Sequence, residues 1–255
     1  MLKIKEFVKV KNLEEAYELN QKKSNRIIGG MLWLKMSKLN VGTAIDLSDL
    51  GLDKITETEN TFEIGCMVTL RDFETHAGLL SYTGGASADC VKDIVGVQFR
   101  NLATMGGSIY SRFGFSDPLT LLLSLDTYVN LYKGGCISLN EYVNMKKDRD
   151  ILTGITVKKQ SGLKCTYDAY RNSRTDFPVI NCAVSVCDTK GVAVIGARPH
   201  KAVRYEFDAS NTAGFAEEIC KNITFGSNMR ASKEYREHLA KVLLERALHK
   251  CGKEI

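Results

Sequence analysis

The sequence has little histidine and no closely spaced cysteines, the two residue types that most often bind transition metals. Its four histidines stand apart, without a second ligand at a spacing that suits a metal. Eight cysteines are present, but no two have the two-residue separation typical of zinc and iron–sulfur sites. We therefore expect no metal or cluster on this chain, and mostly buried, reduced thiols.

Strong charge, long apolar runs and a leader-like segment are also missing. The net charge of +5 comes from 35 basic and 30 acidic residues spread along 255 positions. No basic stripe with interleaved aromatics is present, so nucleic acid is not an expected partner. The opening MLKIKEFVKVKN lacks the apolar core of a signal peptide, and no apolar run reaches membrane-span length. These features predict a cytoplasmic protein with no membrane span.

Strand and helix patterns follow one another in mixed order, which favours an α+β fold. Alternation predicts strands over Ile4–Val10, Lys164–Tyr170 and Val179–Cys187, and a capped amphipathic helix is predicted over Ser232–Lys250. The polar, glycine-containing KKQSGLK lies between a mixed first part and a second part of strands followed by helices. It is a candidate boundary between two domains.

The most informative feature is a repeated glycine pair. IIGGMLWLK and ATMGGSIYS both send an apolar strand into Gly-Gly and then into a new apolar segment. Successive backbone N–H groups in such turns form anion-binding concavities, so two facing turns can hold a pyrophosphate. Asp117 could accept a hydrogen bond from the ribose or ring edge of a cofactor. Each turn taken alone is better explained by the needs of the fold than by a ligand, and Asp117 is also explained by capping a helix before Pro118.

Four segments carry a family resemblance: RIIGG, QFRNLATMGGS, SDPLTLLLSLDTYVNL and MRASKEYREHLAKVLLERAL. In that order they resemble the FAD-binding medium subunit of the molybdenum hydroxylases, the xanthine dehydrogenase and carbon monoxide dehydrogenase family. The resemblance covers nearly the whole chain. It implies a FAD-binding domain of two α+β subdomains, of the vanillyl-alcohol-oxidase-like (PCMH) type, over residues 1–159. A smaller C-terminal domain of a sheet plus helices, residues 160–255, would follow.

The resemblance also implies where FAD lies, extended between the subdomains with its pyrophosphate on the two glycine turns. Arg171 matches a basic position close to the isoalloxazine ring, with Tyr170 in its place if the register slips. Leu152 matches an apolar position near the flavin, and Ile94 falls where some members have an aromatic. The residues expected at FAD are Arg26, Ile27, Ile28, Gly29, Gly30, Met31, Leu32, Trp33, Ile94, Thr104, Gly106, Gly107, Ser108, Asp117, Leu152 and Arg171.

Three departures from the family pattern fall in these segments. Met31 and Leu32 replace a small polar residue and an acid, and Ser108 replaces a common asparagine. SRFGFS stands before Asp117 where the family has a proline and alanines. These changes remove side-chain hydrogen bonds but leave the backbone N–H groups.

The resemblance implies a xanthine-dehydrogenase-like oxidoreductase subunit in which FAD carries out the redox chemistry. No Ser/His/Asp or Cys/His pattern with a supporting motif is present, so no catalytic side chain is predicted. The expected partners are a molybdopterin-binding large subunit and an iron–sulfur small subunit, with NAD or another compound as electron acceptor. Two alternatives remain: a non-catalytic assembly subunit with a degenerate FAD site, and a stand-alone flavin reductase.

Overall fold

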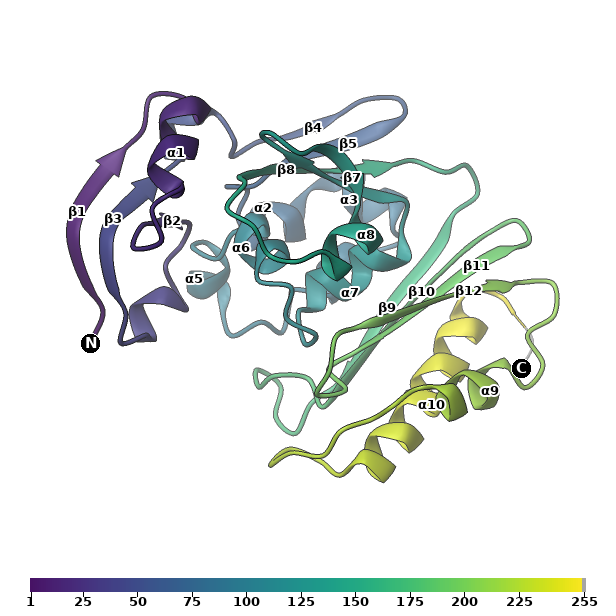
Figure 1. Ribbon diagram of the computed structural model, residues 1–255. Helices are drawn as coiled ribbons and strands as arrows, with labels where there is room; N and C mark the ends of the chain where they lie inside the picture. The colour runs from purple at the N-terminus through teal and green to yellow at the C-terminus, as the bar shows by residue number, and fades with distance from the viewer. Residues whose placement is uncertain (254–255) are drawn as a thin grey trace.

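The computed structural model describes residues 1–253 and contains three separate sheets (Figure 1). The first sheet is formed by β1 (Lys3–Lys9), β3 (Asn40–Asp46) and β2 (Arg26–Ile28), in that order and all parallel. Helix α1 (Leu13–Asn20) makes the crossover that parallel strands require. Asn12 caps α1, since its side chain accepts a hydrogen bond from the N–H of Glu15 at 2.9 Å.

The second sheet is antiparallel and has the order β4-β5-β8-β6-β7. Its strands are β4 (Ile55–Glu57), β5 (Thr61–Gly65), β6 (Thr127–Leu131), β7 (Gly135–Ser138) and β8 (Leu152–Lys158). The helices of this part are α2 (Leu70–Thr75), α3 (Ala77–Tyr82), α4 (Ala86–Asp89), α5 (Val97–Arg100), α6 (Met105–Tyr110), α7 (Asp117–Ser124) and α8 (Leu139–Asn144). Short 3₁₀ turns lie at Leu34–Met36 and Ser48–Leu50. Phe62, Ile155 and Leu121 are fully buried in the core that sheet and helices share.

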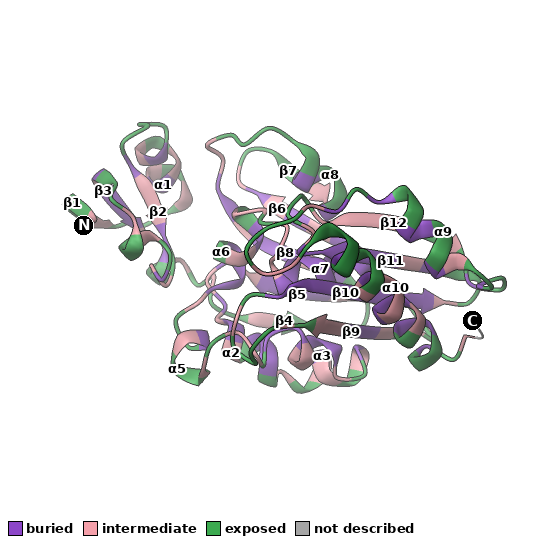
Figure 2. Cartoon of the chain, turned by 90° about the horizontal axis from the view of Figure 1, so that it is seen from below, coloured by how far each residue is buried: buried purple, intermediate pink, exposed green. Residues whose placement is uncertain are grey.

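The third sheet, of order β12-β11-β10-β9, is antiparallel and covered on both faces. It is formed by β9 (Lys164–Tyr170), β10 (Ile180–Cys187), β11 (Lys190–Gly196) and β12 (Val203–Asp208). Cys182 and Val184 of β10 face α9 (Phe215–Asn222) and α10 (Lys233–Lys250), whereas Ala183 joins the core of the first domain on the α7 side. Figure 2 shows the resulting burial along β10. The two domains therefore share a packed interface.

The α+β fold and the two-domain organisation expected from the sequence are confirmed, and five of the eight cysteine side chains are buried. Within residues 1–253 no group of three or more histidine, cysteine or acidic side chains is arranged to hold a metal ion. None of the helices in that range has both the length and the apolarity needed to cross a bilayer.

One local prediction is wrong: the second glycine pair does not end a strand. Gly106 and Gly107 lie in the first turn of α6, which Thr104 caps. Met105 and Ile109 are both fully buried and stand four residues apart, the spacing of one helix face. The segment has only four apolar positions, Ala103, Met105, Ile109 and Tyr110. These are too few to distinguish the alternation of a strand from the periodicity of a helix, so the sequence alone gave the wrong prediction.

The start of α7 is also corrected. Asp117 is its first residue and Pro118 its second, while Ser116 stands at the flanking position without a side-chain capping bond. The Asp117 carboxylate does not cap the helix because it is occupied by Tyr167 of β9, by Arg171 just after β9 and by Asn181 of β10, as described below.

Candidate cofactor site

The first glycine turn offers a row of free backbone donors. It connects β2 to the 3₁₀ turn at Leu34–Met36, and Met31 adopts a left-handed conformation with φ of 57°. Within the described chain, the N–H groups of residues 30 to 34 donate to no acceptor. Unpaired N–H groups on consecutive residues form an anion-binding concavity. This turn is therefore suited to hold a phosphate group.

The two glycine segments touch, as the sequence predicts. A Cβ on Gly30 would lie 1.8 Å from the carbonyl oxygen of Leu102, and a Cβ on Gly29 would lie 2.7 Å from the Thr104 hydroxyl. Only glycine permits this approach at position 30, because any side chain there would overlap the facing backbone, and at position 29 it would crowd the Thr104 side chain. Residues 29–30 and 102–104 thus form one continuous surface.

The second glycine segment differs from the expectation of two equivalent cradles. The N–H groups of Met105 and Gly106 donate to the carbonyls of Val68 and Cys66, both at 2.8 Å. The N–H of Gly107 donates to the Thr104 hydroxyl at 3.2 Å. A Cβ on Gly106 would lie 2.5 Å from the Cys66 oxygen, so this glycine serves packing. The free donors therefore belong to the first turn, and Gly107 contributes an exposed glycine surface.

The hydroxyls after the second glycine pair are tied to the helix backbone. Ser108 Oγ donates to the carbonyl of Thr104 at 3.2 Å, and Ser116 Oγ donates to the carbonyl of Ser108 at 3.2 Å. The second bond joins the end of α6 to the residue before Asp117. It links the glycine surface to the acidic position of the predicted site.

Asp117 and Arg171, both expected at FAD, meet in a buried ion pair. Arg171 Nη2 lies 2.8 Å from Asp117 Oδ2, and the carboxylate is nearly inaccessible. Oδ1 accepts hydrogen bonds from Asn181 Nδ2 at 2.9 Å and from the Tyr167 hydroxyl. Arg171 Nη1 donates to the carbonyl of Asp176 at 2.7 Å. The pair thus fastens α7 to β9 and to the loop that follows β9.

Burial governs the protonation of this network. It raises the pKa of Asp117, and Arg171, Tyr167 and Asn181 act against that rise. Burial lowers the pKa of Arg171, but the attraction of Asp117 outweighs it and leaves the Arg171 pKa above its ordinary value. The Tyr167 pKa is raised well above its ordinary value by burial and by the neighbouring carboxylate. Tyr167 therefore remains a proton donor to Asp117 at physiological pH.

The other predicted residues lie farther from these groups or face inward. Arg26 turns back to the carbonyls of Lys23 and Asn25, at 2.5 and 2.7 Å. Ile27 and Ile28 pair with β3, and Ile28 and Leu32 are buried. Leu152 is buried in β8, and Ile94 packs half-buried on the first core. Their roles at the cofactor stay predictions.

An aromatic cluster that the sequence did not predict joins the two halves of the site. Trp33 lies 5.6 Å from Phe177 in a stacked arrangement, and 6.3 and 6.4 Å from Phe113 and Phe115. Phe113 stacks on Phe115 at 5.0 Å, and Phe115 meets Phe177 edge-on at 4.9 Å. Trp33 follows the first glycine turn, and Phe115 precedes Asp117. The SRFGFS departure signalled only the middle of this cluster, since it places Phe113 and Phe115 beside a predicted cofactor residue but says nothing of Trp33 or Phe177.

Arg100, which lies just before the second glycine segment, was also missed. Its Nε and Nη2 donate to the two Glu74 oxygens at 2.8 and 3.0 Å, a two-point contact between α5 and α2. Its Nη1 donates to the carbonyl of Ile94 at 3.3 Å. A buried arginine three residues before the ATMGG run could have been suspected from RNLATMGG alone.

Replacing Glu74 with glutamine should destabilise the protein in a pH-dependent way. Burial raises the Glu74 pKa, but Arg100 and Arg71 lower it further, so the net value lies below the ordinary 4.5. The stabilisation is therefore complete above pH 4.5 and is lost as the pH falls through the lower folded-state value. We expect Glu74→Gln to cost about 1.5 kcal/mol of unfolding free energy at neutral pH. Urea unfolding of both proteins should show this difference shrinking below pH 4.5; a difference that grows with acidification would contradict the assignment.

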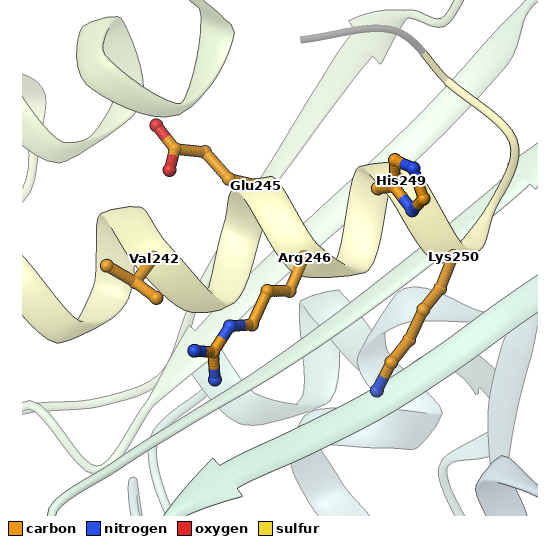
Figure 3. Close-up of a pocket in the computed structure, with 5 residues that line it drawn as sticks. All are labelled: Val242, Glu245, Arg246, His249 and Lys250. Carbon is orange, nitrogen blue, oxygen red and sulfur yellow. The ribbon is translucent and has the colours of Figure 1, made fainter.

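Two shallow hollows lie elsewhere on the surface. One, of about 350 Å³, is a groove along the exposed side of α10 lined by Val242, Glu245, Arg246, His249 and Lys250 (Figure 3). Another, of about 150 Å³, reaches Arg171 and Tyr167 from the side of Asp89, Asp93 and Lys250. Neither includes a residue of the glycine turns. The glycine surface is instead bordered by the aromatic cluster.

The residues present fit the diphosphate end of FAD. The free N–H groups of residues 30–34 supply donors without a charged side chain, and Gly107 leaves the adjoining surface open. Because these are backbone groups, the replacements at Met31 and Leu32 do not remove them. The Asp117–Arg171 pair and the aromatic cluster border the same surface through Ser116 and Trp33.

Comparison with known proteins finds two family models that match this chain. The profile "FAD binding domain in molybdopterin dehydrogenase" matches residues 2–158, and "CO dehydrogenase flavoprotein C-terminal domain" matches residues 165–251. The uncharacterized protein YgfM of Escherichia coli K12 is 25% identical over 249 residues, 94% of each chain.

Two solved structures have the same fold. Carbon monoxide dehydrogenase from Hydrogenophaga pseudoflava aligns with a TM-score of 0.84 and 18% identity over 97% of this chain and 96% of that one. Quinoline 2-oxidoreductase from Pseudomonas putida 86 aligns with a TM-score of 0.84 and 18% identity over 96% of each. The chain belongs to the family of FAD-binding domains of molybdopterin dehydrogenases, with FAD as its cofactor and a C-terminal domain of the CO dehydrogenase flavoprotein type.

Proposed function

We propose that this chain is the electron-transfer subunit of a molybdenum-hydroxylase complex, with its two domains meeting between Lys159 and Gln160. When bound, FAD supplies the exchange between single electrons from a cluster and a two-electron transfer to an acceptor. The observation that carries the proposal is the row of free N–H groups at residues 30–34.

Different residues of the chain hold the two ends of FAD. The first glycine turn binds the diphosphate, and Gly29 and Gly30 allow the second segment to close against it. The Asp117–Arg171 pair holds α7, β9 and the following loop in one arrangement, which fixes the surface on which the ring end of FAD rests. On the family resemblance, we assign molybdenum, clusters and the hydroxylated substrate to partners, a molybdopterin-binding large subunit and an iron–sulfur small subunit.

The acceptor we propose is NAD or another compound, and a xanthine-dehydrogenase-like assignment rests on the resemblance of RASKEYR, residues 230–236, at the start of the last helix. Adding NADH anaerobically to the FAD-loaded chain should bleach the flavin absorbance, whereas free FAD under the same conditions keeps its absorbance. Flavin that is retained but not bleached by NADH would exclude NAD as the acceptor and leave FAD binding intact. A folded chain that retains no added FAD after desalting would exclude the proposed function itself.

A second candidate, an assembly subunit with a degenerate FAD site, is favoured by one observation. The N–H groups of Gly106 and Gly107 are already paired within the chain, so one of the two glycine segments offers no free donor. The same desalting experiment separates the two, since the assembly subunit would return from the column without flavin.

A further inference from the structure

The aromatic cluster of Trp33, Phe113, Phe115 and Phe177 belongs to neither hydrophobic core. The two sets of core residues include none of these rings. Trp33 is 51% exposed, Phe113 42% and Phe177 36%, which is costly for rings with no further partner. Contiguous exposed aromatic surface marks a place where another molecule packs.

Each ring is carried by a connection rather than by a regular element. Trp33 precedes the 3₁₀ turn, Phe113 and Phe115 lie between α6 and α7, and Phe177 lies between β9 and β10. The first two connections contain left-handed residues, Met31 with φ of 57° and Arg112 with φ of 51°. Strained connections of this kind are found where a ligand is positioned. None of the four rings helps to fill either core.

Phe177 is held by the same charges that hold the site. Its N–H donates to Asp176 Oδ1 at 2.7 Å, and Arg230 pairs with Asp176 at 3.0 Å while its guanidinium lies 5.0 Å from the Phe177 ring centre. The Asp176 carbonyl accepts from Arg171, the partner of Asp117. The position of Phe177 is therefore linked to the ion pair that borders the cofactor surface.

Trp33 is placed to receive a ring from the glycine turn. Its own N–H is one of the free donors, so a ligand whose phosphate rests on this turn has its remaining part within reach of the indole. The flat face of Trp33 that such a ring would need is taken by Phe177, stacked at 5.6 Å with 30° between the planes. A planar ring and Phe177 cannot share that face.

We propose that the isoalloxazine ring of FAD stacks on Trp33 in the place that Phe177 occupies here. Phe177 is then a cover that the flavin ring displaces. This inference rests on the proposed function, because it takes FAD as the ligand. It assigns opposite effects to two residues in contact: Trp33 favours binding of the ring, and Phe177 competes with it. If the two residues had only a structural role, removing either side chain would weaken FAD binding.

The test compares FAD with ADP, which shares the diphosphate but lacks the flavin ring. Equilibrium dialysis of the full chain gives both affinities for wild type, Trp33→Leu and Phe177→Ala. Trp33→Leu should bind FAD about two- to tenfold more weakly, and Phe177→Ala about two- to tenfold more tightly, since an aromatic pair is worth about 0.5–1.5 kcal/mol and about 1.4 kcal/mol is tenfold. ADP affinity should be unchanged in both. Phe7→Leu, on the exposed first strand, is the matched control and should change neither affinity.

The fluorescence of bound FAD provides a second readout that does not depend on measuring an affinity. Stacking on an indole quenches flavin emission, and Trp33 is the single tryptophan of the chain. Bound FAD should be dim in wild type and Phe177→Ala and bright in Trp33→Leu. Two results would overturn the proposed role of Phe177 while leaving FAD binding in place. One is equal FAD affinity and equally bright bound flavin in wild type and all variants. The other is a fall in FAD affinity in both Trp33→Leu and Phe177→Ala. Chain that binds neither FAD nor ADP would instead remove the proposed function.

Discussion

Replacing Asp117 with alanine is expected to lower the free energy of unfolding by about 3–5 kcal/mol, the usual cost of leaving one partner of a buried ion pair alone. Arg171 would keep its charge with a side chain only 9% exposed, and Tyr167 and Asn181 would lose their common acceptor. Urea unfolding measures the loss directly.

Two comparisons separate this loss from a general effect of removing a carboxylate. Asp93 also pairs with an arginine, Arg174, at 2.9 Å, but that arginine is 84% exposed. Asp93→Ala should therefore cost at most about 1 kcal/mol. The double variant Asp117→Ala with Arg171→Met should be more stable than Asp117→Ala alone, because the unpaired buried charge is gone. An Asp117→Ala protein as stable as wild type would show that the pair contributes nothing to docking the domains.

Replacing Gly30 with alanine is expected to separate the two glycine segments. The new Cβ would lie 1.8 Å from the Leu102 carbonyl oxygen, and backbone cannot move aside as a flexible side chain can. We expect a loss of about 1–3 kcal/mol in unfolding free energy. FAD affinity should fall at least about tenfold, because the free N–H groups shift with the turn.

The matched control is Gly96→Ala, where the nearest heavy atom to the new Cβ is Gln98 Oε1 at 3.5 Å. This variant should keep both wild-type stability and wild-type FAD affinity. Dialysis against FAD and urea unfolding of the two variants side by side make the comparison. A Gly30→Ala protein with unchanged stability and FAD affinity would mean that the close approach of the segments is unimportant.

The sequence predicted what depends on pattern and missed what depends on contact across the fold. The capped helix beginning after Ser232 and the strand Lys164–Tyr170 were found because capping residues and alternation act within a few positions. The helix at Met105–Tyr110 was missed, because its start is fixed by the carbonyls of Val68 and Cys66 from a distant segment.

The site divides in the same way. The sequence itself indicated the glycine pairs and Asp117, and the resemblance added Arg171, but neither indicated that Asp117 and Arg171 bind each other across 54 positions. Nor does any local pattern indicate that Trp33, Phe113 and Phe177 converge, since each ring lies on a different connection. Those facts depend on how α7 packs against the third sheet.

The central claim is that the first glycine turn of this chain binds a diphosphate and thereby FAD. Equilibrium binding of FAD and FMN to the purified chain tests it most directly, because FMN carries the same flavin ring but has neither the diphosphate nor the adenosine. We predict one FAD per chain and an affinity at least about tenfold above that for FMN. Equal affinity for FAD and FMN, or no binding of FAD to a folded chain, would contradict it.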